Sequence, residues 1–103
     1  MPKQNTTTAT NNAILDCDPR PGYYYVSVID GPRHALVAGP FDTHRAALDM
    51  VKRAENAGNE CDPKSVFYGW GTCRLERDET KPMRTGVLNS RLGLADGLTR
   101  EVA

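Results

Sequence analysis

Aromatic residues are confined to the middle of this 103-residue chain. Its four tyrosines, two phenylalanines and one tryptophan all lie between positions 23 and 70. Aromatic side chains bury the largest areas and dominate the energetics of cores and interfaces. We therefore predict one folded domain over residues 21–77. Residues 1–20 are polar over most of their length and are expected to be a disordered N-terminal segment.

The C-terminal residues 78–103 are expected to form a flexible tail. Within it, Val87, Leu88, Leu92 and Ala95 are spaced for one face of a short helix. A helix of about ten residues is not stable alone in water. The tail must therefore dock on the domain or on a partner, or stay disordered.

The clearest strand signal covers Tyr23 to Ile29, where aromatic and β-branched residues predominate. Asp30-Gly31-Pro32-Arg33 has the composition of a tight turn. His34 to Ala38 is predicted to return as the second strand of a hairpin. Gly39-Pro40 is expected to end that strand, because proline cannot donate a hydrogen bond to the ladder.

A helix is predicted from about Thr43 to Ala57. Asp42 or Thr43 is suited to cap its N-terminus, and Gly58 is expected to cap its C-terminus. One apolar stripe follows the helical repeat and is formed by Ala47, Met50, Val51 and Ala54.

A third strand is predicted from Val66 to Leu75, with Gly69 and Gly71 on either side of Trp70. The order strand, strand, helix, strand predicts an α+β fold of two layers. In this ββαβ arrangement, one helix packs on a three-stranded antiparallel sheet, and the termini are disordered or docked.

Charge and hydropathy exclude several classes of protein. The 13 basic residues are balanced by 13 acidic ones, giving a formal net charge of zero. Nucleic-acid binding draws on clustered Lys and Arg, so this balance makes nucleic acid a less favoured partner. No apolar run approaches the ~20 residues that span a bilayer, and the N-terminus lacks the apolar region of a secretory signal. We expect a cytoplasmic protein without a membrane partner.

The residues that usually carry catalysis do not form a recognisable pattern. Cys17, Cys61 and Cys73 are widely spaced, and no two Cys or His ligands have the close spacing of a zinc site. Nothing in the sequence pairs His34 or His44 with a thiol that it would activate. We therefore expect no enzyme activity, no catalytic residue, no metal and no cofactor.

The candidate binding residues are the aromatic side chains that a helix on the opposite side of the sheet would leave free. Tyr, Trp and Arg are also the residue types of binding hot spots. Three interpretations stay open, namely a protein or dimer interface, a platform for stacked nucleic-acid bases, and the second side of a small core. The predicted binding residues are Tyr23, Tyr25, Arg33, Tyr68, Trp70 and Arg74.

Three stretches carry a resemblance to known proteins. They are residues 22–28 with the turn 30–33, residues 38–44, and Asp62-Pro63 followed by residues 67–73. Over about residues 22–75 the chain is similar to small uncharacterised accessory proteins of bacteriophages, prophages and integrative conjugative elements. Proteins of this kind often bind a host or element protein, as anti-CRISPR and other anti-defence proteins do.

These observations predict a non-enzymatic protein-binding accessory protein of a phage or mobile element. It would act in the bacterial host cell by occupying a host or element protein, with a homodimer as a further expectation. The alternative is a small nucleic-acid-binding protein that uses an aromatic sheet face.

Overall fold

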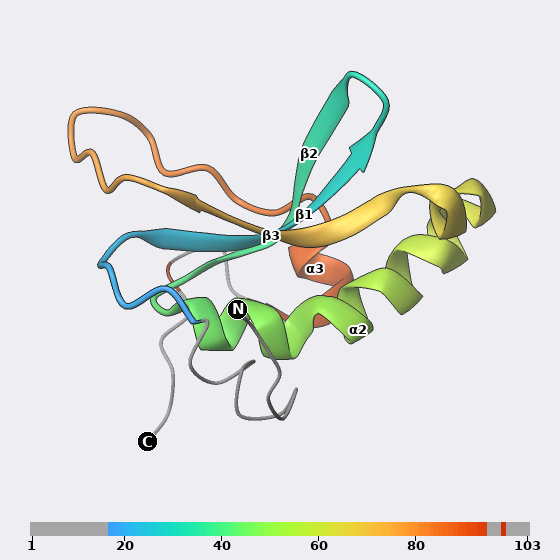
Figure 1. Cartoon of the computed structure of the whole chain (residues 1–103), viewed down its shortest axis with the longest axis horizontal. Helices are drawn as coiled ribbons and strands as arrows, with labels where there is room; N and C mark the ends of the chain where they lie inside the picture. Colours follow the sequence, from blue (N-terminus) through green and yellow to red (C-terminus); the bar gives the residue numbers. More distant parts are fainter. Residues whose placement is uncertain (1–16, 95–97, 99–103) are drawn as a thin grey trace, which may run out of the picture.

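The computed structural model describes residues 17–94 and residue 98. In chain order the elements are β1 (Tyr23–Asp30), β2 (Arg33–Phe41), α2 (His44–Cys61), the 3-10 helix η1 (Pro63–Phe67), β3 (Gly69–Leu75) and α3 (Asn89–Leu92). The strands form an antiparallel sheet in the order β2-β1-β3, and α2 lies across one face of it (Figure 1). The predicted two-layer ββαβ fold is confirmed.

The hairpin turns where the sequence indicates, but its second strand is longer than expected. Only Gly31 and Pro32 separate β1 from β2, and Gly31 has a φ of 60°. The strand continues through Gly39 and Pro40 to Phe41. The register between β1 and β2 shifts there, beside Tyr24 and Val26. The prediction that Gly39-Pro40 ends the strand is therefore wrong. The ladder is irregular at this point, so the strand can continue although proline has no N–H to donate.

The helix begins as predicted and ends later. The Thr43 hydroxyl accepts a hydrogen bond from the Ala46 N–H at 3.1 Å, which makes Thr43 the N-cap. The prediction that Gly58 caps the C-terminus is wrong. Gly58 is buried inside the helix, which runs to Cys61 and is capped by Asp62. The ring of Trp70 occupies the space that a larger side chain at position 58 would need.

The third strand is shorter than predicted. Residues 66 and 67, expected in the strand, belong to η1, and β3 begins only at Gly69. Asp62 caps η1 by accepting a hydrogen bond from the Lys64 N–H at 3.1 Å, and Pro63 stands at its first position. A proline directly after an Asp cap favours a helical turn over a strand.

The core lies between the sheet and α2. Tyr24, Val26, Val37, Ala38 and Phe41 of the hairpin pack against Ala47, Ala54 and Ala57 of the helix, which confirms the predicted apolar stripe. Met50 and Val51 are partly buried at the edge of this cluster. No helix among the described residues is long and apolar enough to cross a membrane.

The C-terminal segment is docked as far as the structure describes it. Leu92 belongs to the core, and the backbone N–H groups of residues 86, 87 and 88 donate to carbonyl oxygens of β2 at 2.8–3.0 Å. The packed unit thus extends beyond the boundary expected at residue 77. Gly86 fits there because an added Cβ would lie 2.4 Å from the Cα of Ala38. The predicted short helix is present as α3, while Ala95 and residues 1–16 lie outside the described residues.

Candidate functional site

A groove runs between the β1–β2 hairpin and the C-terminal end of α2. In Figure 1 the hairpin projects away from the helix at this point. The groove consists of two adjoining hollows of about 360 and 200 Å³, which share Val28, Ala35, Asp62 and Tyr68 in their walls. We call it the hairpin groove. It brings together three of the predicted binding residues, Arg33, Tyr68 and Trp70.

The inner half of the hairpin groove is apolar, with Val28, Val37 and Trp70 in its walls. Trp70 is held rigidly, because its indole N–H donates to the Ser65 carbonyl at 2.9 Å and its ring packs on Gly58. Val28 and Trp70 are opposite each other on β1 and β3, so they stand on the face that α2 covers. A partner's apolar side chain would meet a preorganised wall here.

The other half of the groove carries charged and polar side chains. Arg33 forms an ion pair with Asp30 across the turn, and Tyr68 donates its hydroxyl proton to Asp62 at 3.0 Å. This hydrogen bond to the Asp62 carboxylate raises the pKa of Tyr68 above its ordinary value. Tyr68 therefore remains neutral and directed at Asp62. This half of the groove presents a cation, Arg33, and two carboxylates, Asp30 and Asp62, to a partner.

Unusually exposed apolar side chains lie beside the groove on η1. Phe67 is 88% exposed and Val66 is 56% exposed. Both precede Tyr68, which lines the groove, and η1 forms the right-hand end of the molecule in Figure 1. Val87, at the other side of the apolar half, is also exposed. Neighbouring exposed apolar groups of this size mark interaction sites on soluble proteins.

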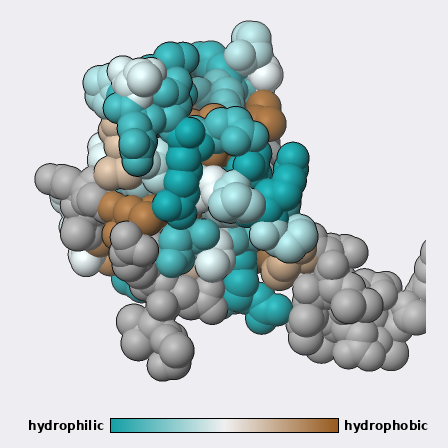
Figure 2. Space-filling model, turned by 90° about the vertical axis from the view of Figure 1, so that its left-hand side faces the viewer, coloured by the Kyte–Doolittle hydropathy of each residue, from teal (hydrophilic) through white to brown (hydrophobic). Residues whose placement is uncertain are grey.

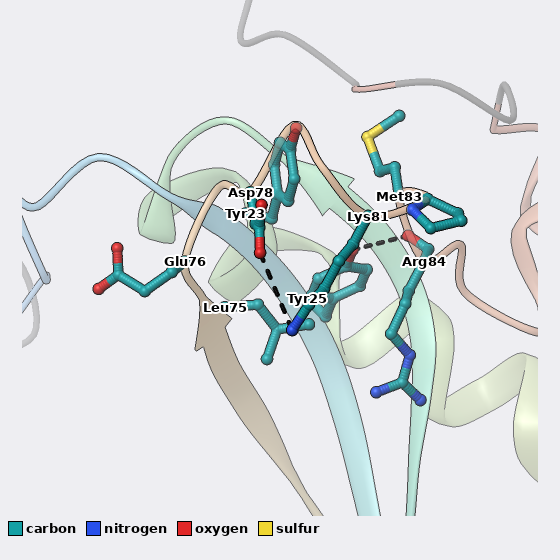
Figure 3. A pocket seen from close by; sticks show the side chains of 9 residues that line it. Tyr23, Tyr25, Leu75, Glu76, Asp78, Lys81, Met83 and Arg84 are labelled. Atoms are coloured by element: carbon teal, nitrogen blue, oxygen red, sulfur yellow. Dashed lines mark hydrogen bonds and ion pairs between the residues drawn. The ribbon is translucent and has the colours of Figure 1, made fainter.

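The opposite face of the sheet carries Tyr23 and Tyr25. Tyr25 is 0% exposed, and its hydroxyl donates to the Arg84 carbonyl at 2.6 Å. Figure 3 shows both rings beneath the loop that follows β3, around a hollow of about 290 Å³. The Arg77 guanidinium lies 5.1 Å from the centre of the Tyr23 ring. These tyrosines hold the loop on the sheet, and that end of the molecule is mostly hydrophilic (Figure 2).

Arg74 belongs to a third cluster, at the start of α2. Its guanidinium donates to the Pro21 carbonyl at 2.5 and 3.1 Å and forms an ion pair with Glu76. Nearby, His44 accepts the Asp18 N–H at its Nδ1 (2.7 Å) and contacts the Thr72 hydroxyl through Nε2 (3.0 Å). The Tyr24 ring stacks on His44 with centroids 5.4 Å apart. This cluster fixes residues 18–22 to the domain.

The six predicted binding residues therefore do not form one surface. Arg33, Tyr68 and Trp70 meet in the hairpin groove. Tyr23 and Tyr25 lie on the other face of the sheet, and Arg74 holds the chain before β1. The expected single aromatic face is wrong, since β1 pairs Val28 rather than a tyrosine with Trp70 and loop residues cover Tyr25.

The sequence interpretation missed the exposed pair Val66 and Phe67. It assigned them to the third strand, where they would have been shared between its two faces. The Asp62-Pro63 pair was the available signal, because an Asp cap followed by proline starts a helical turn. No local signal could have identified Val28 and Ala35 as groove residues, since that depends on where α2 ends.

In residues 17–94 and 98, no three His, Cys, Asp or Glu side chains are placed to hold a metal ion. Burial raises the pKa of Cys73, which disfavours the thiolate that nucleophilic chemistry requires. Thr72 turns towards His44, so its neighbour Cys73 points to the other face of the sheet.

The fold is that of a small two-layer α+β domain, and the hairpin groove is its candidate binding surface. A comparison with protein-family models found no match, and comparisons with curated proteins and with solved structures found none either.

Proposed function

We propose that this protein is a non-enzymatic protein-binding module that holds a segment of a partner protein in the hairpin groove. The observation that carries the proposal is an apolar hollow that adjoins a hollow with charged side chains, together with a phenylalanine that is 88% exposed and precedes the groove residue Tyr68 in the chain. Burying such a side chain stabilises a complex by about 1.5–3 kcal/mol. In the described structure the ring of Phe67 is not buried, so this stabilisation is available for binding.

The composition of the groove supports a protein partner. Arg33, Tyr68 and Trp70 line it, and these residue types are enriched among hot spots of protein interfaces. The resemblance of residues 22–75 to accessory proteins of mobile elements supports a host or element protein as the partner. Binding would then act in the bacterial cytoplasm by occupying the partner's surface, as an anti-defence or anti-CRISPR-like inhibitor does.

Two groove variants test the proposal by affinity capture from a bacterial host lysate, followed by quantitative mass spectrometry. Ala35→Lys places a long charged side chain in the wall shared by both hollows, and Phe67→Ser removes the exposed ring. Asn56→Lys, on an exposed position of α2, is the control of equal charge. We expect a partner that the wild type and Asn56→Lys retain and that both groove variants lose.

Folding is checked on the same samples. Phe67→Ser is expected to change the free energy of unfolding by no more than about 0.5 kcal/mol, because the ring contributes almost nothing to the core. Equal capture of every protein by all four samples would contradict the groove as the binding site.

A nucleic-acid-binding role has weaker support. The aromatic rings that it requires lie on opposite faces of the sheet, and the net charge is zero. Titration against labelled single-stranded and duplex DNA at two salt concentrations discriminates between the roles. A steep loss of affinity with added salt would favour nucleic acid over protein.

A further inference from the structure

We propose that the protein forms a two-fold symmetric dimer in which β3 pairs antiparallel with β3 of a second copy, in a register centred on Thr72. This interface lies along the far edge of the sheet from β2. It does not depend on the proposed function of the hairpin groove.

The first observation is a free strand edge. β3 is the outer strand of the sheet and pairs with β1 along its whole length, from Gly69 to Leu75. Among the described residues, no other backbone hydrogen bond reaches this strand. The other outer strand, β2, is partly covered by residues 86–88. An uncovered edge is a template for pairing with another chain.

The second observation is that β3 lacks the features that usually protect an edge. Proteins blunt exposed edges with proline, lysine or inward-pointing charges. β3 has the sequence GWGTCRL, and its one charged residue, Arg74, is tied to the Pro21 carbonyl. Its charge is therefore not placed to prevent the edge of β3 from pairing with another strand.

The third observation is two glycines that the monomer does not explain. Glycine weakens a strand interior, and it often marks a place where another backbone approaches closely. A Cβ added at Gly71 would meet no atom within 4 Å, and one at Gly69 would meet Ile29 only at ordinary contact distances of 3.8–3.9 Å. Neither glycine has a positive φ. Among the described residues of one copy, nothing requires a small side chain at either position, so we infer that the requirement comes from a second chain.

A second copy of β3 supplies that requirement. In an antiparallel register centred on Thr72, Leu75 lies opposite Gly69 of the other copy, and Cys73 lies opposite Gly71. On the other face, Arg74 lies opposite Trp70, a pair of types that attract each other. Each large side chain thus meets a small or complementary one. The self-complementary sequence is what selects a second copy over an unrelated peptide.

The first test measures molar mass against protein concentration by sedimentation equilibrium. We expect a reversible dimer of the 11.3 kDa chain in the wild type. Gly71→Lys introduces an edge-blocking charge at a position with free space in the monomer. It should leave the melting temperature of the monomer nearly unchanged and abolish the dimer, whereas Asn56→Lys should dimerise like the wild type.

The second test reads the register. In a background where Cys17, Cys61 and Cys73 are replaced by Ser, Thr72→Cys places two thiols directly opposite each other across the two-fold axis. Such cross-strand positions are close enough for a disulfide. We expect rapid crosslinking under mild oxidation, and only slow crosslinking for the control Val66→Cys, which is exposed but lies off the edge.

A wild type that stays monomeric up to high micromolar concentration would overturn the proposal. A dimer that survives Gly71→Lys, or one in which both cysteine variants crosslink at the same rate, would overturn it equally. Loss of partner capture by Ala35→Lys together with an intact dimer would separate the groove from this interface.

Discussion

The side-chain amide of Asn89 pairs with both backbone hydrogen-bonding groups of Gly39. Its Nδ2 donates to the Gly39 carbonyl at 2.5 Å, and its Oδ1 accepts the Gly39 N–H at 3.0 Å. Asn89 is 3% exposed. The amide therefore hydrogen-bonds the backbone of β2 as a neighbouring strand would, and it connects residues that are 50 positions apart in the chain.

We predict that Asn89→Ala lowers the free energy of unfolding by about 1–3 kcal/mol. The substitution leaves the Gly39 N–H without its partner and removes one of two donors to the Gly39 carbonyl, which still accepts the Gly86 N–H at 2.9 Å. Urea denaturation followed by circular dichroism measures the loss. Ser90→Ala, at the exposed next position, is the matched control and should change stability by less than about 0.5 kcal/mol. Equal stability of the two variants would show that the amide pair contributes nothing.

Gly58→Ala is predicted to destabilise the protein. Helix propensity alone favours alanine over glycine by about 1 kcal/mol. At this position an added Cβ would lie 2.6 Å from Cη2 and 2.9 Å from Cζ2 of Trp70. Helix α2 and the Trp70 ring cannot both keep their positions around an alanine at residue 58. We therefore expect thermal unfolding at a lower temperature than in the wild type.

The cause of that loss is checked with a second substitution. Trp70→Phe removes both indole atoms that the new Cβ would meet. We expect Gly58→Ala to be less harmful, or even stabilising, in the Trp70→Phe background. An unchanged penalty in a double-mutant cycle would mean that the clash is not its source.

Trp70→Ala is predicted to cost about 2–3 kcal/mol of stability, somewhat less than truncating a fully buried Trp. The ring is half-buried against α2, and its N–H donates to Ser65. Chemical denaturation with tyrosine fluorescence as the signal measures the change. A stability equal to that of Phe67→Ser would place Trp70 outside the packed structure. Because Trp70 supports the fold, its truncation does not isolate a binding role.

The Asp18 carboxyl is predicted to titrate well below its ordinary range. The Arg20 side chain donates to it at 2.6–3.2 Å, and the Arg20 N–H donates at 2.9 Å. These hydrogen bonds lower the pKa of Asp18 in the folded state. A carboxyl with a lowered folded pKa contributes its full stability above its unfolded pKa of about 3.9, and this contribution is lost progressively as the pH falls from there through the folded value.

Carbon-13 NMR of the Asp18 carboxyl across the acid range measures this titration directly. Arg20→Gln should move the midpoint upwards, towards the ordinary value, because the charged donor is gone. A wild-type midpoint that already lies near the ordinary value would contradict the role assigned to Arg20.

Local signals predicted most of the fold correctly. The turn at Gly31-Pro32, the cap at Thr43 and the apolar stripe from Ala47 to Ala54 follow from chemistry within a few residues, so the sequence reveals them. Two of the errors arose at Gly39-Pro40 and Gly58. At both, a contact from a distant part of the chain overrides the local tendency to break an element.

The candidate site was only half predictable. Residue type indicated Arg33, Tyr68 and Trp70 as binding residues on an exposed sheet face. The structure places them in the hairpin groove instead, and their role in binding stays a prediction. Residue type gave the wrong prediction for Tyr25, whose hydroxyl donates to an arginine carbonyl 59 residues later and whose ring is buried. The exposure of a strand residue depends on which segment packs over it. The alternation of apolar and polar residues along the strand does not contain that information.

The sequence alone determined that a hairpin, a helix and a further strand follow one another, since each is specified by periodicity and turn chemistry over a short stretch. The tertiary structure alone decided which rings are covered, where the groove opens and which strand edge is left without a backbone partner among residues 17–94 and 98. Those outcomes follow from contacts between segments tens of residues apart, whose free energies appear only when the whole chain is packed.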